Sequence, residues 1–189
     1  MAVPAVVRFG IGFAQGAQEA AEVLALTTPV ELKYHYTGDF AATPKNQATA
    51  STMFQQDTEV IFAAGGAVGQ SVMSAAELED AKVIGVDINQ GGDSDTVITS
   101  AMKGLGASVK QALAEYYADE FRGGETVVFN ASNDGVGLPT DAESFRFDTF
   151  TVAQYNAVFA DLADGSIVVL NDLTLGTEAQ INGGFDTTL

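Results

Sequence analysis

A glycine-rich turn lies between an apolar run and a helical segment, where a ligand could approach the backbone closely. Residues 64–69 read AGGAVG, so Gly66 and Gly69 match the last two glycines of the pattern G-x-G-x-x-G, whereas Ala64 stands at the first position. The N–H groups at the start of a following helix would face a ligand bound there. An ordinary strand-to-helix turn also needs glycine. Both interpretations remain open from the local pattern.

Asp87 is the second candidate, because it ends the next apolar run, 21 positions after Gly66. Ligands of open α/β sheets bind outside the carboxyl ends of the strands. A carboxylate at that edge can accept two hydrogen bonds from a ribose diol. A helix N-cap or a solvated strand end would place an aspartate there equally well.

Two further side chains could contact a planar, hydroxylated ligand. Phe40 follows a predicted strand in a short loop, where its ring could stack on the ligand or anchor the loop to the core. Lys103 is one of only 8 cationic residues and lies in a predicted helix. Its ammonium could donate to ligand hydroxyls, although a solvated helix lysine is the more ordinary interpretation.

Composition excludes several kinds of site. The chain has no cysteine, which rules out disulfides, Cys-zinc sites and thiol catalysis, and its single histidine, His35, is interpreted as structural. The net charge of −17 argues against a nucleic-acid partner, because phosphates attract cations. No G-x-S-x-G motif indicates a hydrolase. We predict no enzyme activity, no cofactor and no metal site.

The sequence contains no apolar run of the ~18–20 residues that a membrane helix needs. The start of the chain, MAVPAVVRFGIGF, has no basic region followed by a long apolar stretch and is therefore not expected to be a signal peptide.

The first half of the chain alternates between helical and strand patterns. Apolar spacing predicts helices over residues 6–26, 43–56 and 67–79, and strands over residues 30–37, 59–64 and 82–87. Short connections in the order β-α-β-α-β imply a parallel sheet with helices on its faces. The predicted fold class is therefore α/β.

The second half is predicted with fewer strong signals. A polar loop over residues 89–95 is expected to end in Asp93, Ser94 or Asp95 as the cap of a helix that reaches Phe121. Another helix is expected over residues 152–164. Short strands are expected over residues 125–130, 136–138, 145–149 and 166–170, followed by a frayed tail.

Five segments in order resemble one family. They are YTGDFAATPKNQATASTMFQQDTEVIFAAGG, VIGVDINQ, VITSAMKGLGASVKQAL, GVGL and a helix ending ADGSIVVL. Their order and spacing over about residues 5–170 resemble the basic-membrane-protein (BMP) family of solute-binding lipoproteins of ABC importers, which includes purine nucleoside receptors. The resemblance implies a two-lobed, type I periplasmic-binding-protein fold, of which this chain is expected to be a truncated part. That part would comprise residues 1–90 as the second, C-terminal lobe, residues 91–170 as a crossover helix and strands partly belonging to the first lobe, and residues 171–189 as a tail.

The resemblance also implies roles for the candidate residues. Phe40 matches an aromatic that stacks on the base, and Gly66 matches a glycine that lies against the ribose. Asp87 and Lys103 match residues that bond the ribose hydroxyls. Asn89 stands where relatives usually carry a second acid, which is a departure from the family pattern.

The expected function is that of an extracytoplasmic receptor for purine nucleosides, with an ABC transporter permease as the partner of the full-length protein. The chain is expected to lack the export signal and most of the first lobe, and so to bind nucleosides weakly or not at all on its own. A nicotinamide-dependent oxidoreductase that uses the glycine-rich turn is one alternative. An inactive truncated product, prone to self-association through uncovered apolar surface, is another.

Overall fold

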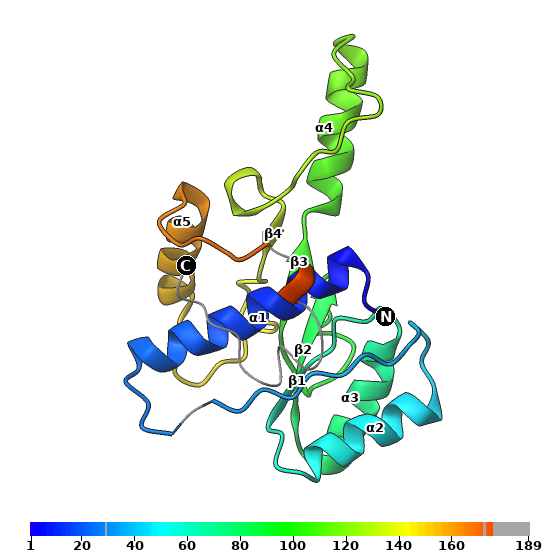
Figure 1. The fold of residues 1–189 in the computed structure, drawn as a ribbon, viewed down its shortest axis with the longest axis vertical. Coiled ribbons are helices and arrows are strands. Elements are labelled where there is room, and N and C mark those ends of the chain that lie inside the picture. Colours follow the sequence, from blue (N-terminus) through cyan, green and yellow to red (C-terminus); the bar gives the residue numbers. More distant parts are fainter. Residues whose placement is uncertain (29, 172, 176–189) are drawn as a thin grey trace.

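The computed structural model describes residues 1–28, 30–171 and 173–175 (Figure 1). None of the helices in these ranges has the length and apolar character needed to cross a bilayer. The elements in chain order are α1 (Pro4–Val23), α2 (Pro44–Phe54), β1 (Val60–Phe62), α3 (Val68–Glu79), β2 (Lys82–Asp87), β3 (Val97–Lys103), α4 (Leu105–Tyr117), the 3₁₀ turn η1 (Ala131–Asn133), β4 (Val136–Gly137), α5 (Val152–Asp164) and the 3₁₀ turn η2 (Leu173–Leu175).

The strands form one sheet in the order β1-β2-β3-β4. β1, β2 and β3 are parallel, with Ile61 opposite Val83 and Asp87 opposite Met102. The short β4 pairs antiparallel with the end of β3, where Lys103 lies opposite Val136. The predicted α/β class is confirmed, but the sheet is mixed because of β4.

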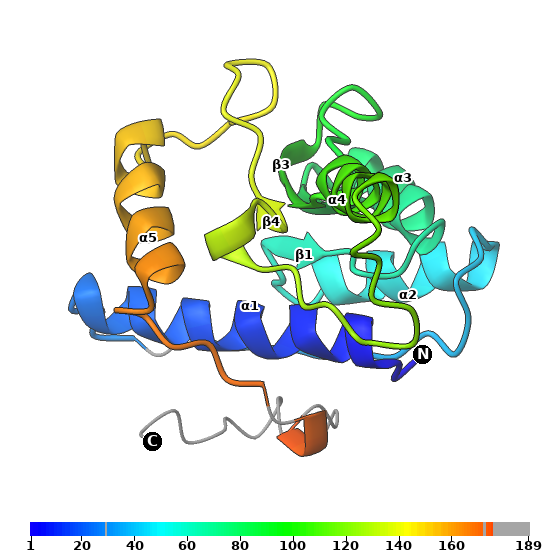
Figure 2. The same cartoon turned by 90° about the horizontal axis from the view of Figure 1, so that it is seen from above.

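Helices cover both faces of the sheet, as predicted. Consecutive side chains of a strand point to opposite faces, and in β1 these faces meet different helices. Ile61 packs against the core of α2 and α3, whereas the ring of Phe62 lies 5.7 Å from that of Phe9 on α1. Seen from above, α1 runs along one side of the strands and α3 lies on the other (Figure 2).

The predicted helix ending at Phe121 is wrong over its first part. Residues 97–103 form β3, and only Leu105–Tyr117 are helical. The β-branched run at Val97, Ile98 and Thr99 favours a strand, and Gly104 ends it. Asp93, Ser94 and Asp95 therefore lie in the connection between β2 and β3 and cap no helix.

Four other predicted strands are not strands in the described part of the chain. None of these four segments has sheet pairing: residues 30–37, 125–130, 145–149 and 166–170. In the first of these segments Leu32, Tyr34 and Tyr36 pack on α1 instead. The predicted strand at 136–138 is confirmed as β4. Most of the tail, residues 176–189, lies outside the described residues.

Helix α4 projects from the body of the molecule (Figure 1). It has no buried residue, and its apolar side chains Leu105, Val109, Leu113 and Tyr116 are all more than half exposed. Their spacing places them along one side of the helix. An isolated helix of this length is only marginally stable in water.

We therefore expect the backbone amides of α4 to exchange with solvent at least about a hundredfold faster than those of α3, which contributes Val72, Ala75 and Ala76 to the core. Hydrogen exchange followed by NMR at neutral pH measures both helices in one experiment. Equal protection of α4 and α3 in the monomer would contradict this account of α4.

Candidate ligand-binding site

Asp87 and Lys103 end two adjacent parallel strands and face each other. The Lys103 Nζ lies 2.6 Å from Oδ1 of Asp87, and about a third of each side chain or slightly more remains exposed. Oδ1 is itself buried, with the Lys103 ammonium as its partner. The exposed part of the carboxylate is its other oxygen, Oδ2, which keeps acceptor capacity for a ligand.

The backbone at Asp87 adopts a strained turn. The N–H of Ile88 donates to the carbonyl of Val86 at 2.8 Å, across Asp87 with a φ of 69°. A three-residue turn with positive φ is rare, and strained residues of this kind concentrate at functional sites. The turn lets the chain fold back, so that Gln90 accepts a hydrogen bond from the Val86 N–H (2.8 Å) and donates its own N–H to Ser100 Oγ (3.0 Å).

Phe40 lies in a loop that is held by its neighbours. Gly38 turns the chain with a φ of 87°. Asp39 Oδ1 then accepts hydrogen bonds from the Ala41 N–H (3.0 Å) and from the side-chain amide of Asn46 (3.2 Å). Together these two donors hold the pKa of the Asp39 carboxyl below its usual value.

Asn46 links this loop to the start of α2. It is almost fully buried and also donates to the Ala41 carbonyl at 2.9 Å. The helix begins as the Thr43-Pro44 pair predicts, because Thr43 Oγ1 accepts the Asn46 N–H at 3.1 Å. Phe40 is therefore presented by a fixed loop, with 37% of the residue exposed.

The glycine-rich turn lies beside Phe40. Gly66 has a φ of 58°, and a Cβ atom built on it would lie 3.6 Å from Cβ of Phe40. That distance is an ordinary van der Waals contact, so it is the positive φ, which glycine adopts without strain, that favours glycine here.

All four predicted residues line one hollow. Phe40, Gly66, Asp87 and Lys103 share it with Phe9 of α1, and the remaining lining residues are Val3, Ala5, Val6, Ala64, Gly65 and Val86. The hollow has a cavity volume of about 190 Å³ and opens to solvent, so it would enclose only part of a small organic molecule. The predicted helical position of Lys103 is wrong, because it is the last residue of β3, and there it lies beside Asp87 at the sheet edge.

Sequence reasoning missed the residues that support the site. Phe9 places its ring 4.9 Å from Lys103 Nζ, close enough for a cation–π interaction. Nothing in the spacing of α1 indicates that contact, because it depends on how α1 crosses the sheet. The role of Asp39 could have been predicted, since an aspartate side chain commonly accepts a hydrogen bond from the backbone N–H two residues later and so forms a turn.

The arrangement suits a ligand with hydroxyl groups and a planar ring. An anionic acceptor and a cationic donor lie side by side, and both can bond a pair of hydroxyls. An exposed aromatic ring borders the same hollow and can stack on a planar group. In the described residues, no cluster of three or more acidic or histidine side chains could hold a metal ion.

Comparison with known proteins places the chain in a family. The family model for Bmp, described as "ABC transporter substrate-binding protein PnrA-like", matches residues 1–156. The chain belongs to the Bmp family. Proteins of this family are substrate-binding proteins of ABC transporters and not enzymes, which excludes the nicotinamide-dependent oxidoreductase alternative.

Individual relatives agree with this assignment. This Bmp-family chain is 29% identical to the "ABC transporter nucleoside-binding protein BmpA" of Lactococcus lactis, over 87% of its own length and 49% of the relative's. It is 33% identical to "Basic membrane protein D" of Borreliella burgdorferi over 69% of its length and 38% of the relative's. The chain thus spans half or less of the length of these relatives.

A solved structure supports the fold. An ABC transporter solute-binding protein from Aeropyrum pernix K1 superposes with a TM-score of 0.64 at 23% identity, over 96% of this chain and 52% of that one. At this identity the likeness concerns the fold alone. It agrees with the predicted periplasmic-binding-protein-like architecture.

The Asp39 contacts predict a pH dependence of the Phe40 loop. Because the pKa of Asp39 is lowered in the folded chain, its stabilising effect is present above the unfolded value of 3.8 and is lost as pH falls through the lower folded value. We expect the Ala41 amide signal in NMR to titrate with a midpoint below 3.8. In Asp39→Asn this titration should vanish; a midpoint above 3.8 in the parent chain would contradict the assignment.

Replacing Gly66 tests the backbone requirement of the turn. Gly66→Ala should lower the free energy of unfolding by about 1 kcal/mol, because an L side chain is strained at positive φ. Gly92→Ala is the matched control: Gly92 lacks a positive φ and has no atom within 4 Å of an added Cβ, so its change should stay within about 0.5 kcal/mol. Urea unfolding measures both variants, and equal changes would refute the requirement.

Proposed function

We propose that this chain forms one side of a purine nucleoside-binding cleft in an extracytoplasmic substrate-binding protein of an ABC importer. The observation that carries the proposal is the common hollow of Phe40, Gly66, Asp87 and Lys103. In this proposal Phe40 stacks on the base and Gly66 lets the ribose approach the backbone. The paired Asp87 and Lys103 bond the ribose hydroxyls.

The charges of the site support this ligand class over an anionic one. Among the described residues that line the hollow, Lys103 is the only cation, and its charge is already balanced by Asp87. A phosphate group would therefore meet a local charge near zero on a chain of net charge −17. A neutral diol uses both partners of the ion pair without adding charge. The name of the Lactococcus lactis relative, a nucleoside-binding protein, agrees with this choice.

The chain alone should bind nucleosides weakly. Phe40 stacks on one side of the base only, and the hollow is open to solvent. The other side of a bound base therefore remains exposed to water. Substrate-binding proteins gain affinity when two domains close around the ligand. In the full-length protein we propose a transporter permease as the partner that receives the ligand.

NMR titration of the chain with adenosine, inosine and guanosine tests the proposal. We expect saturable shift changes at Gly65, Gly66 and Asp87, with a dissociation constant in the millimolar range and no comparable change on adding maltose. In Asp87→Asn the shift changes at a fixed nucleoside concentration should fall about tenfold, because a charge-assisted hydrogen bond is lost.

The matched control is Asp161→Asn, which makes the same chemical change at an exposed position of α5. It should leave the nucleoside titration unaltered. Asn also tolerates positive φ, so Asp87→Asn should keep its fold, which circular dichroism checks. Shift changes that ignore Asp87→Asn, or that spread evenly over the surface, would reject the proposed site.

A further inference from the structure

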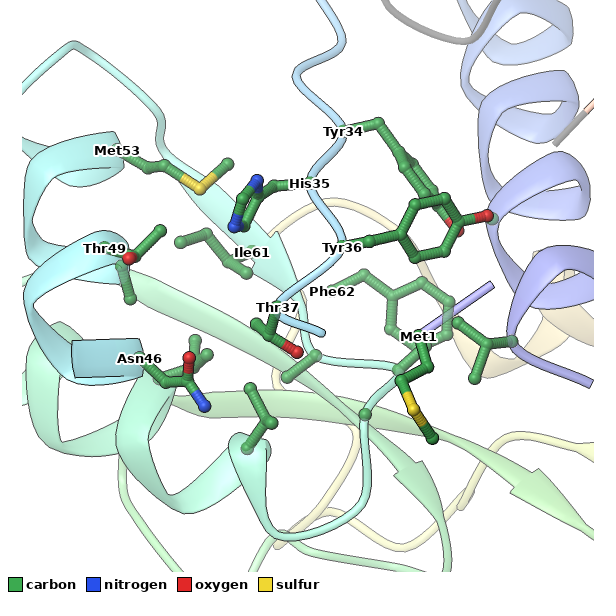
Figure 3. Close-up of a pocket in the computed structure, with 18 of the residues that line it drawn as sticks. Met1, Tyr34, His35, Tyr36, Thr37, Asn46, Thr49, Met53, Ile61 and Phe62 are labelled. Carbon is green, nitrogen blue, oxygen red and sulfur yellow. The ribbon is translucent and has the colours of Figure 1, made fainter. Parts of the chain in front are cut away.

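The connection between β4 and α5 passes along β3, the strand that ends in Lys103. β4 pairs with the end of β3, and the N–H of Arg146 donates to the Ile98 carbonyl near the start of that strand at 2.8 Å. Residues 138–146 therefore return from the end of β3 to its beginning. The apolar pocket drawn in Figure 3 borders β1, at the other end of the strand order, and neither Asp87 nor Lys103 lines it.

The Arg146 side chain ties this connection to the loop between β2 and β3. Its Nη2 donates to the Gly91 carbonyl at 2.8 Å. Its Nη1 donates to the carbonyls of Val97 at 2.8 Å and Ser94 at 3.2 Å. Because the donors of a guanidinium have a fixed planar arrangement, three acceptors on one side chain also fix the course of the loop. Among the described residues, no carboxylate forms an ion pair with Arg146, so the tie is to backbone atoms.

A second contact lies two residues before the arginine. Ser144 is buried, and its Oγ accepts a hydrogen bond from the side-chain amide of Asn89 at 2.8 Å. The side chain of Asn89 also accepts the Gly91 N–H at 3.0 Å. Gly91 leaves the space for this contact, since a Cβ atom built there would lie 2.8 Å from Ser144 Oγ. We call Asn89, Gly91, Ser144 and Arg146 together the loop clamp.

The loop clamp holds residues that directly follow Asp87. The positive φ of Asp87 is a conformation that persists only where the surrounding structure over-determines the backbone. Gln90 ties the turn to β2 and β3 from within the sheet. The loop clamp fixes the residues on either side of Gln90, Asn89 and Gly91, from outside the sheet. Without these ties the backbone could return to an ordinary φ, which would turn the carboxylate away from Lys103.

We propose that Arg146 and Ser144 are positioning residues of the candidate site. Through the loop clamp they fix the backbone of Asp87, so that its carboxylate meets Lys103 at the hollow. Neither Arg146 nor Ser144 lines the hollow, so both act on a ligand only through Asp87. The consequence for nucleosides rests on the proposed function, whereas the consequence for the Asp87 backbone can be measured without a ligand.

NMR of the ligand-free chain tests the backbone first. A positive φ brings the amide and α protons of a residue close together, so Asp87 should give a strong intraresidue NOE in the parent chain. In Arg146→Gln this NOE should lose about half its intensity or more, because one side-chain amide cannot donate to three carbonyls of the loop. Arg122→Gln is the matched control. Its guanidinium bonds Glu115 on α4, and its loss should leave the Asp87 NOE unchanged.

Replacing Gly91 opens the loop clamp by a second route. The methyl group of Gly91→Ala would displace the Ser144 hydroxyl and break its hydrogen bond to Asn89. Gly92→Ala adds the same group at the next position, where an added Cβ has no atom within 4 Å. Neither glycine has a positive φ, so a difference between the two variants reports the contact with Ser144. We expect a weakened Asp87 NOE in Gly91→Ala alone, and this pair decides the question if Arg146→Gln does not fold by circular dichroism.

The same variants test the effect on the ligand. At one adenosine concentration, the shift changes at Gly65 and Gly66 should fall about fivefold in both clamp variants, because a displaced carboxylate forms a poorer charge-assisted hydrogen bond. Both control variants should respond like the parent chain.

Two results would overturn the inference. One is an Asp87 NOE that is weak in the parent chain, or that stays strong in the folded clamp variants, which would mean that the clamp does not set the turn. The other is an adenosine response that persists in those variants although the NOE is lost. If the parent chain shows no response to adenosine, the proposed function fails, and the NOE still decides whether the loop clamp fixes Asp87.

Discussion

Parallel pairing of β2 with β3 sets Asp87 opposite Met102, and this register puts the Lys103 ammonium 2.6 Å from the Asp87 carboxylate. The rest of the site depends on that placement. The turn at Gly65 and Gly66 follows β1 at the same sheet edge, and the Phe40 loop packs beside it. Helix α1 completes the hollow by laying Phe9 near Lys103. A shift of one residue between β2 and β3 would move the ammonium away from the carboxylate and separate the donor from the acceptor.

Local signals predict much of this site. The cap and proline at Thr43 and Pro44, the glycine-rich turn and the apolar strand ending in Asp87 are all where the sequence indicates, because each depends on neighbours a few residues away. Lys103 was predicted on the wrong element and still belongs to the hollow. The neighbouring residues Met102, Leu105 and Val109 have helical spacing, but the preceding β-branched residues favour a strand.

Contacts between distant segments could not be predicted in the same way. The segment over residues 30–37 alternates as a strand does, yet it packs through Leu32, Tyr34 and Tyr36 on α1 and stays outside the sheet. Periodicity reports which side chains share a face and says nothing of whether a neighbouring strand is within reach. The apolar side of α4 belongs to the same problem, because its spacing is typical of a buried face and yet Leu105, Val109 and Leu113 are more than half exposed.

The left-handed backbone at Asp87 has a consequence for how this position can vary. Only glycine, asparagine and aspartate adopt that conformation readily, and the genetic code puts the first two a single nucleotide away from aspartate. Either replacement would keep a residue that tolerates positive φ while removing the anionic group from the hollow. Under the proposed function, a one-step mutation of this kind would abolish ligand recognition without the loss of expression or solubility that accompanies unfolding.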